Sequence, residues 1–212
     1  MPADSCPSPE VRETYFDAPR VALLHGMGPG AQAYHSGHNS WSPAGWRDLV
    51  ESPLRIANPV RRNTADDPRW DDPVRHHSSW LLALADGERS LLLGALEGDT
   101  PRLHADLDVL SGWTETGRPG RWVLLEGPEL QVFERYRALL QDHYGARDRD
   151  PGTVWSSWYS LYEDISRQAF DSILPELPGL GFDTFQVDDG WQRVVGDWEP
   201  NDKFPAGMAE IV

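Results

Sequence analysis

Two leucine-rich runs in the middle of the chain predict its clearest element. Residues 80–85 and 89–96 are joined by Asp86-Gly87, a pair that suits a tight turn, so we expect a β-hairpin there. Further short runs with strand character are residues 21–24, 103–110 (which alternates imperfectly) and 120–125. Short strands separated by turn signals predict an antiparallel β-sandwich.

The period of the apolar residues changes after Pro128. Apolar side chains then recur every three or four positions, which predicts one face of a helix made of Leu130, Phe133, Tyr136 or Arg137, and Leu140. We expect the helix to end at residues 143–145. The polar segment 146–152 contains Asp150-Pro151-Gly152, so we place a domain boundary there, with a first domain at 1–150 and a second at 151–212.

The second domain begins with a strand, a helix and a strand. Residues 153–159 are β-branched and aromatic, and residues 182–187 form another apolar run. Between them, Asp164 or Ser166 can cap a helix whose apolar face holds Phe170, Ile173, Leu174 and Leu177. A strand–helix–strand unit of this kind places its two strands parallel to each other.

The second of these strands carries an unusual polar face. Side chains alternate along a strand, so Phe185 and Val187 share a face that should pack on helices. The opposite face holds Thr184, Gln186 and Asp188, whereas parallel strands are normally apolar on both sides. Since the carboxyl ends of such strands are where α/β proteins place their sites, we expect a pocket here.

The residues that follow make this pocket a candidate sugar site. Asp188 would point inward and Asp189 would lie at the rim, with each carboxylate able to accept hydrogen bonds from hydroxyls. Gly190 permits a sharp exit and Trp191 could form a wall. Two alternatives are a solvated Asp-Asp-Gly turn and a catalytic pair. Neighbouring strand residues diverge, so a retaining pair about 5 Å apart is geometrically awkward.

Tryptophan is abundant, with 10 in 212 residues, and we expect most of them in the core and two or three at a site. Trp155 and Trp158 have opposite parity, so a regular strand cannot turn both inward. Trp158 lies nearer the carboxyl end of its predicted strand and is the better pocket candidate, whereas Trp155 suits an interface with helices.

Two other segments read as loops. Apart from residues 21–24, the segment 1–30 is rich in Pro, Gly and Asp and is expected to be irregular. Residues 34–46 could place Asn39 and Trp41 against a ligand or form a turn of the β domain, and we favour the turn. Residues 51–76 read as a surface loop in which the aspartates do not follow the EF-hand pattern, so no metal site is expected at Asp66, Asp67, Asp71 or Asp72.

Composition narrows the class of protein. The net charge is −15 and the longest basic run is Arg61-Arg62, which argues against a nucleic-acid partner. No apolar run approaches the roughly 18 residues of a membrane helix, and the N-terminal residues lack the features of a signal peptide. Cys6 is the single cysteine, which agrees with a reducing compartment, and we expect a cytoplasmic protein without a cofactor.

Several motifs together resemble α-galactosidases of glycoside hydrolase family 36 (melibiase-like enzymes). Trp158 and Asp188 lie 30 positions apart within Trp-Ser-Ser-Trp-Tyr and Phe-Gln-Val-Asp-Asp-Gly-Trp-Gln. Gly196-Asp-Trp198 and the segment 203–208 (Lys-Phe-Pro-Ala-Gly-Met) follow, and Asn39-Ser-Trp-Ser is similar to a Gln-Ser-Trp segment of the family's sandwich. The similarity covers roughly residues 34–212.

The resemblance implies a β-sandwich followed by a (β/α)8 TIM barrel that acts on terminal α-linked galactose with retention. Asp188 and Asp189 would hold the O4 and O6 hydroxyls, Trp158 would line the same subsite, and Asp197 and Trp198 would have a lesser role. In the family, the nucleophile and the acid/base lie on later barrel strands. Residues 151–212 hold only the first two βα units, so we expect an N-terminal fragment that is inactive alone.

Two alternatives remain open. A galactosyltransferase of the raffinose-synthase type would share the galactose subsite and differ in its acceptor. A non-catalytic carbohydrate-binding or assembly module would use the sandwich and bind sugar without Asp188. We expect α-galactoside oligosaccharides as ligands, and the complete enzyme could be an oligomer.

Overall fold

The computed structural model describes residues 10–28, 30–36, 44–53, 72–87, 89–145, 147 and 149–210. It divides the chain into two compact units, Met1–Arg147 and Asp148–Val212, which are treated one at a time below. The sequence prediction had drawn its boundary between residues 150 and 151. The motif at residues 39–42 lies outside the described residues, as do Cys6, Asp66, Asp67 and Asp71.

The first unit is mostly β-structure. Its described strands are β1 (Arg12–Ala18), β2 (Arg20–Leu24), β3 (Gln32–His35), β4 (Gly45–Asp48), β5 (His76–Ser79), β6 (Leu81–Ala85), β7 (Ser90–Glu97), β8 (Pro101–Ala105), β9 (Val109–Thr114) and β10 (Gly120–Gly127). They form a six-stranded sheet, β1-β10-β7-β6-β3-β4, and a four-stranded sheet, β2-β9-β8-β5, in which every pairing is antiparallel. This two-sheet arrangement agrees with the predicted sandwich.

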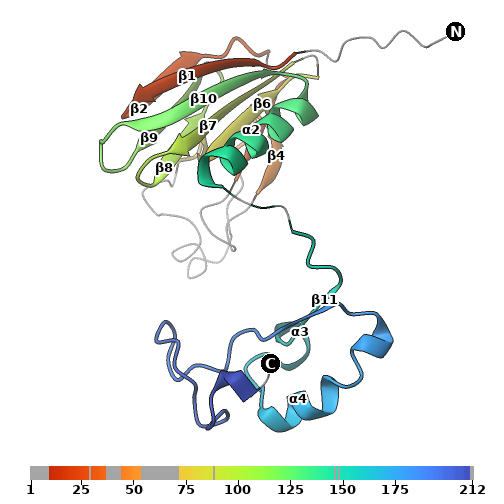
Figure 1. Cartoon of the computed structure of the whole chain (residues 1–212). Coiled ribbons are helices and arrows are strands. Elements are labelled where there is room, and N and C mark those ends of the chain that lie inside the picture. Colours follow the sequence, from red (N-terminus) through yellow and green to blue (C-terminus); the bar gives the residue numbers. More distant parts are fainter. Residues whose placement is uncertain are drawn as a thin grey trace, which may run out of the picture. The chain divides into compact units, whose positions relative to one another are not determined.

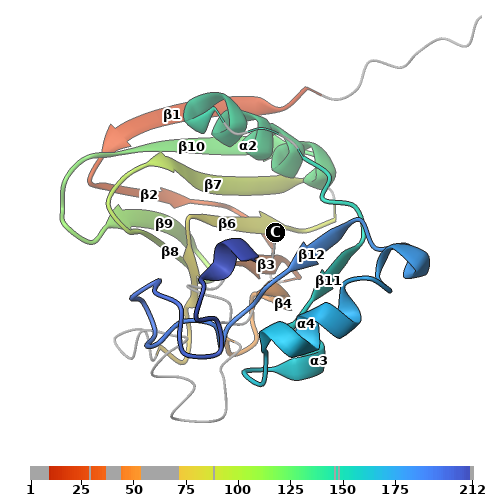
Figure 2. The same cartoon turned by 60° about the horizontal axis from the view of Figure 1, so that its bottom comes forward.

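The six-stranded sheet is covered on both faces, which explains its continuous apolar runs. In β7, Leu91 and Leu93 lie in the core between the two sheets, whereas Leu92 and Leu96 lie in a second cluster under the helix α2 (Glu129–Tyr144). Figures 1 and 2 show α2 running along β10, β7 and β6. A strand buried on both sides needs apolar residues at every position, so alternation disappears.

Trp122 of β10 joins the two sheets. Its side chain is fully buried, and a Cβ atom built at Gly112 of β9 would lie 2.6 Å from the indole ring. Only glycine lets the ring approach the facing strand this closely. The indole Nε1 also donates a hydrogen bond of 3.0 Å to the Ala18 carbonyl oxygen. One side chain thus contacts both layers and the end of β1.

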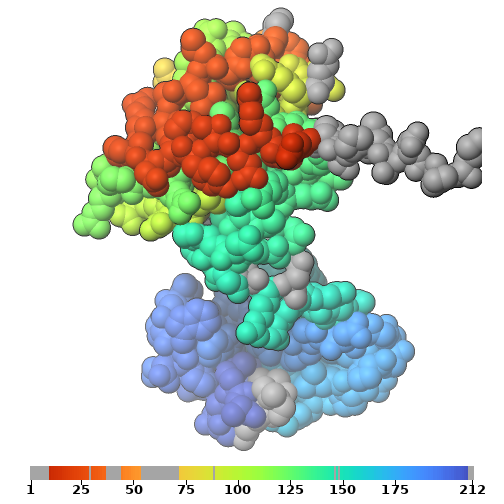
Figure 3. Space-filling view, turned by 45° about the horizontal axis from the view of Figure 1, so that its top comes forward, coloured from red at the N-terminus to blue at the C-terminus, as the bar shows by residue number. Residues whose placement is uncertain are grey.

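Two predictions for this unit were wrong. Residues 12–18 were expected to be irregular but form β1, an edge strand whose side chains are mostly exposed, so it lacks an apolar pattern (Figure 3). Residues 103–110 were read as one imperfect strand but belong to β8 and β9. The turn between these strands forms because the Asp106 carboxylate accepts hydrogen bonds from the backbone N–H groups of Asp108 and Val109 at 3.1 and 2.9 Å.

The hairpin of β6 and β7 and the helix α2 confirm their predictions, with one change of detail. Helix α2 follows Pro128 and ends at Gly145, which adopts φ 63° and donates its N–H to the Gln141 carbonyl. Val132 and Tyr136 are its buried residues, whereas Leu130 is 70% exposed. The apolar face is therefore rotated from the predicted one, and Tyr136 rather than Arg137 faces the sheet.

Tyr136 braces a bend in the chain between β5 and β6. Its hydroxyl donates to the Ala95 carbonyl at 2.7 Å and lies 3.2 Å from the carbonyl oxygen of Trp80, a residue with a positive φ of 69°. Burial raises the pKa of this phenol. No side chain larger than hydrogen fits at Gly94, because an added Cβ would lie 2.3 Å from the Tyr136 ring.

Replacing Tyr136 by phenylalanine should lower the free energy of unfolding of this unit by about 1–2 kcal/mol, because buried carbonyls lose their donor. Urea unfolding followed by far-UV circular dichroism measures this loss. The matched control is Tyr144→Phe, which removes a more exposed hydroxyl that donates to the Leu96 carbonyl at 2.9 Å. Equal losses in the two variants would contradict the bracing role.

The outer face of the four-stranded sheet carries an aromatic cluster of His77, His104 and Trp113. The His104 Nε2 atom lies 2.8 Å from the Ser111 hydroxyl. Burial, helped by the nearby charges of His77 and Arg75, lowers the pKa of His104 to about 4. Burial also lowers the pKa of His76. Both imidazoles are therefore neutral in the folded protein at neutral pH.

These histidines make the first unit less stable in mild acid. An unfolded imidazole titrates near pH 6.5, so between about pH 6.5 and 4 the unfolded chain takes up a proton that folded His104 does not. Stability should fall across this window by about 2–3 kcal/mol from His104. Urea unfolding at a series of pH values should show a flatter profile for His104→Gln than for the wild type. Parallel pH profiles of stability for His104→Gln and the wild type would contradict the assignment of this loss to His104. Asp72 does not interfere, because its pKa is lowered to about 2 and it titrates below the window.

The second unit contains a parallel strand pair with short helices. Its elements are β11 (Val154–Ser156), α3 (Trp158–Leu161), α4 (Arg167–Ile173), η2 (Pro178–Leu180), β12 (Thr184–Gln186) and η3 (Met208–Glu210). Strands β11 and β12 pair in parallel, as the strand–helix–strand pattern predicted (Figure 2). Both strands are shorter than predicted. In the described part of the chain, no helix is long and apolar enough to span a membrane.

Helix α4 covers one face of this strand pair. Ser166 caps it, accepting a hydrogen bond from the Ala169 N–H at 3.2 Å, which decides between the two predicted caps. Phe170 of α4 is fully buried, and its ring contacts Phe185 of β12 edge-on at 5.2 Å. Val187 packs on the same cluster. Phe185 and Val187 therefore face the helix, which leaves the other face of β12 for polar groups.

Candidate functional site

Asp188 lies two residues after the end of β12, on the face away from α4. Its Oδ2 atom accepts hydrogen bonds from the Ser156 hydroxyl at 3.1 Å and from Gln186 Nε2 at 3.3 Å. Ser156 is the register partner of Gln186 across the parallel pair, so both donors come from one end of the sheet. The Asp188 N–H donates to Oγ of the fully buried Ser157 at 2.9 Å. The carboxylate is therefore held from two strands.

Asp189 is held by the turn that follows it. Its Oδ1 atom accepts from the Gly190 N–H at 2.8 Å and from Gln192 Nε2 at 2.5 Å, and its own N–H donates to Asp188 Oδ1 at 2.9 Å. No residue that the structure describes donates a hydrogen bond to its Oδ2 atom. Both aspartates are half-buried. Such ordered, partly shielded carboxylates differ from a freely solvated turn, and one carboxylate oxygen stays open to a ligand.

At Gly190, a second segment of the chain comes close to the turn that follows the two aspartates. Gly190 has a φ of 101°, and an added Cβ would lie 2.8 Å from the backbone Cα of Glu163. A side chain at this position would collide with main chain, which cannot move aside cheaply. The Asn201 side chain then fastens the turn by donating to the Gly190 and Gln192 carbonyls at 2.9 and 3.2 Å.

The structure corrects the placement of Trp158. It was predicted on the strand, but β11 ends at Ser156 and Trp158 is the first residue of α3, because Ser157 already has helical dihedral angles. The parity argument therefore does not apply to it. Trp158 is half-buried, and its N–H donates at 3.3 Å to Ser156 Oγ, the hydroxyl that binds Asp188. Trp155 stacks on Phe185 at 5.2 Å on the α4 side, the side expected for it.

The remaining predicted site residues lie in the loop after Asp189. Trp191 packs against the apolar cluster of the second unit and lies 5.9 Å from Trp198, ring centroid to ring centroid. Trp198 is 77% exposed with a positive φ of 56°. The Asp197 carboxylate lies 3.5 Å from Arg193 Nε. The structure thus joins Trp191 to the turn and leaves Trp198 at its outer side.

Sequence reasoning missed the residues that hold the two aspartates, namely Ser156, Ser157, Gln192 and Asn201. Strand parity could have found Ser156, because it points to the same side as Gln186 once the parallel pairing is known. The others act across turns, where no periodic signal exists. The expectation that most tryptophans lie in the core was also too strong, since of those described only Trp122 is fully buried.

This arrangement offers acceptors for hydroxyl groups. Groups of three or more His, Cys, Asp or Glu side chains placed to hold a metal are absent from the described residues.

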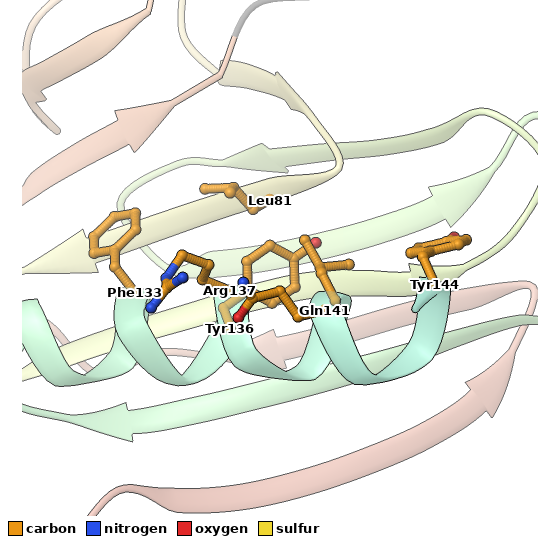
Figure 4. A pocket seen from close by; sticks show the side chains of 7 residues that line it. Leu81, Phe133, Tyr136, Arg137, Gln141 and Tyr144 are labelled. Atoms are coloured by element: carbon orange, nitrogen blue, oxygen red, sulfur yellow. The ribbon is translucent and has the colours of Figure 1, made fainter. Parts of the chain in front are cut away.

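A separate cavity of about 390 Å³ lies in the first unit between α2 and β6 (Figure 4), with a lining of Leu81, Phe133, Tyr136, Arg137, Leu140, Gln141 and Tyr144. Its accessible walls are largely apolar, so it offers few of the acceptors that a sugar needs.

Solved structures of similar fold point to one group of enzymes. The chain matches an α-galactosidase from Thermus thermophilus, solved with p-nitrophenyl α-D-galactopyranoside, at 37% identity and a TM-score of 0.75, over 93% of this chain and 40% of that one. The complex of that α-galactosidase with stachyose gives a TM-score of 0.74 over 93% of this chain and 42% of that one. A family GH36 α-galactosidase from Geobacillus stearothermophilus, at 14% identity, covers 91% of this chain and 30% of its own, and its TM-score of 0.52 supports the fold alone.

A curated relative has a neighbouring activity. An A type blood α-D-galactosamine galactosaminidase from Flavonifractor plautii is 24% identical over 226 residues, which is 95% of this chain and 19% of the relative. No family model matches the chain. The chain spans less than half the length of these relatives.

Proposed function

We propose that this chain, which is α-galactosidase-like and of the glycoside hydrolase family 36 type, supplies part of the galactose subsite of a retaining α-galactosidase. The proposed ligands are oligosaccharides with a terminal α-linked galactose. The observation that carries the proposal is the pair of half-buried carboxylates of Asp188 and Asp189 at the carboxyl end of β12, each fixed by surrounding donors.

The chemistry of the pair suits sugar hydroxyls. A carboxylate oxygen has more than one lone-pair site, so Asp188 can accept from its protein donors and still bind a ligand O–H. Asp189 has an oxygen without a donor from the described residues. Two adjacent acceptors of this kind match two neighbouring hydroxyls, and the family resemblance assigns them to O4 and O6 of galactose. Trp158, Trp191 and, less directly, Asp197 and Trp198 would shape the walls.

The parallel pair β11 and β12 is proposed to be the start of a (β/α)8 barrel. In such barrels the ligand site lies at the carboxyl ends of the strands, which is where Asp188 and Asp189 lie. Residues 1–150 would then be the sandwich domain with its linker helix, and residues 151–212 the first part of the barrel.

The groups that break the glycosidic bond are expected elsewhere. Asp188 and Asp189 are neighbours tied to each other through the Asp189 N–H, which suits binding on one side of a sugar better than flanking its bond. The family resemblance places the nucleophile and the acid/base on later barrel strands. The proposal therefore assigns binding, not bond cleavage, to this chain, in a cytoplasmic enzyme without a cofactor.

The complete protein that contains this chain provides the test. We expect it to hydrolyse p-nitrophenyl α-D-galactopyranoside and to release α-galactose first, as followed by proton NMR before mutarotation. The β anomer as first product would contradict retention, and no reaction with α-galactosides would contradict the proposal. Galactosyl transfer to an acceptor sugar as the main reaction would favour the raffinose-synthase type. Galactose binding that survives Asp188→Ala, with no turnover, would favour a binding module.

A further inference from the structure

The side-chain amide of Gln192 has one hydrogen-bonded end and one unpaired end, which the proposed sugar contacts do not explain. One end of this side-chain amide lies 2.5 Å from Asp189 Oδ1, and the other end, Oε1, is buried and has no hydrogen-bond partner among the residues that the structure describes. Only the amide nitrogen can face a carboxylate oxygen at this distance, because two oxygens without a proton between them repel each other. The orientation of the amide is thus determined by Asp189.

The unpaired oxygen shows which contact decides this orientation. A buried carbonyl oxygen without a donor is unfavourable, so an amide that only filled space would not be expected to keep it. The amide nevertheless keeps its nitrogen on Asp189, because an N–H group binds a charged acceptor more strongly than a neutral one. Holding Asp189 is therefore the stronger demand at this position.

The backbone around Gln192 is fixed independently of its side chain. Asn201 Nδ2 donates to the Gln192 carbonyl at 3.2 Å, and the Asn201 N–H donates to the Trp191 carbonyl at 2.8 Å. Gln192 also forms a bridge with Pro200. The side chain therefore extends from a fixed turn, and its amide holds the Asp189 carboxylate by a hydrogen bond.

We propose that Gln192 is a positioning residue of the galactose subsite, a role that rests on the function proposed above. Together with the Gly190 N–H, its amide occupies Asp189 Oδ1 and so turns Oδ2 toward the ligand. The ligand class is a pyranose that presents hydroxyls to this oxygen. Because the same oxygen is used in the ground state and in the transition state, Gln192 sets binding rather than the chemical step.

Two variants of nearly unchanged volume test this role in the complete protein. Gln192→Met keeps the packing and removes the donor, and should raise KM for p-nitrophenyl α-D-galactopyranoside about tenfold with kcat within about twofold. Gln192→Glu also replaces the donor by a second carboxylate, and should raise KM about 100-fold at pH 7. At pH 5, the KM ratio of Gln192→Glu to the wild type should fall, because two carboxylates in contact share a proton that restores the donor.

The outcomes separate this inference from the proposed function. Suppose that the wild type is active and that Asp189→Asn weakens binding. If Gln192→Met and Gln192→Glu then have the KM of the wild type, or the same KM as each other, at both pH values, Gln192 only packs and the inference is wrong. A fall in kcat at unchanged KM would also overturn it. If the wild-type protein neither binds galactose nor acts on α-galactosides, the proposed function itself fails. Far-UV circular dichroism checks that each variant is folded.

Discussion

Replacing Asp188 by asparagine in the complete protein is expected to lower kcat/KM for an α-galactoside by about 10²- to 10⁴-fold. Hydrogen bonds to a charged group contribute about 1.5–3 kcal/mol each, and a sugar hydroxyl and the two protein donors that hold Asp188 would all lose their charged partner. In the wild type, Ser156 and Gln186 donate hydrogen bonds to the Asp188 carboxylate. In the variant, these two donors face an amide nitrogen or a neutral oxygen. Steady-state kinetics with p-nitrophenyl α-D-galactopyranoside measures the effect.

The matched control is Asp171→Asn in the same unit. Asp171 is exposed on α4 and pairs with Arg167 at 2.8 Å, an ion pair of the kind that contributes little in water. This variant should keep the wild-type kcat/KM. An Asp188→Asn enzyme that is folded and as active as the control would show that the carboxylate does not bind the substrate.

Trp122→Ala should remove about 3–5 kcal/mol from the stability of the first unit, the largest loss expected for one side chain there. The residue is fully buried between the sheets, lies against Gly112, and donates to the Ala18 carbonyl. Truncating a large aromatic side chain loses its transfer free energy and leaves a cavity that strands on both sides cannot close. Urea unfolding followed by far-UV circular dichroism measures the change in midpoint.

Trp113→Ala is the control of the same residue type. Trp113 lies on the opposite face of β9 and is half-buried beside His77 and His104, so its loss should be clearly smaller. If Trp122→Ala does not fold, Trp122→Phe replaces it. Per unit of side-chain area removed, Trp122→Phe should lose more free energy of unfolding than Trp113→Ala. Equal losses at both positions would contradict the central place of Trp122.

Trp158 lies near the two aspartates for a structural reason other than the one predicted from the sequence. Trp158 was selected because it was expected on a strand, yet it begins α3. It nevertheless lies beside the aspartates, because its N–H and Asp188 share the Ser156 hydroxyl. Chain proximity to β11 placed it there, whereas the side-chain parity of a strand did not.

Local patterns in the amino-acid order were enough for several features. The hairpin of β6 and β7, the helix α2 after Pro128, the parallel pairing of β11 and β12, and the division of β12 into an apolar and a polar face all follow from short-range periodicity, caps and turn residues. These features depend on residues a few positions apart, so the information is present within each segment. The motif around Asp188 and Asp189 was visible for the same reason.

Other features arise from contacts between residues far apart in the chain, and the sequence pattern is silent on them. The edge strand β1 exists because β10 offers it hydrogen bonds, although its own residues are mostly exposed. The face that α2 buries is chosen by the sheet beneath it, which selects Tyr136 and leaves Leu130 outside. Likewise, Gln192 and Asn201 reach the aspartate turn only when the loop has closed. Tertiary packing decided these points because each requires a partner that the segment does not contain.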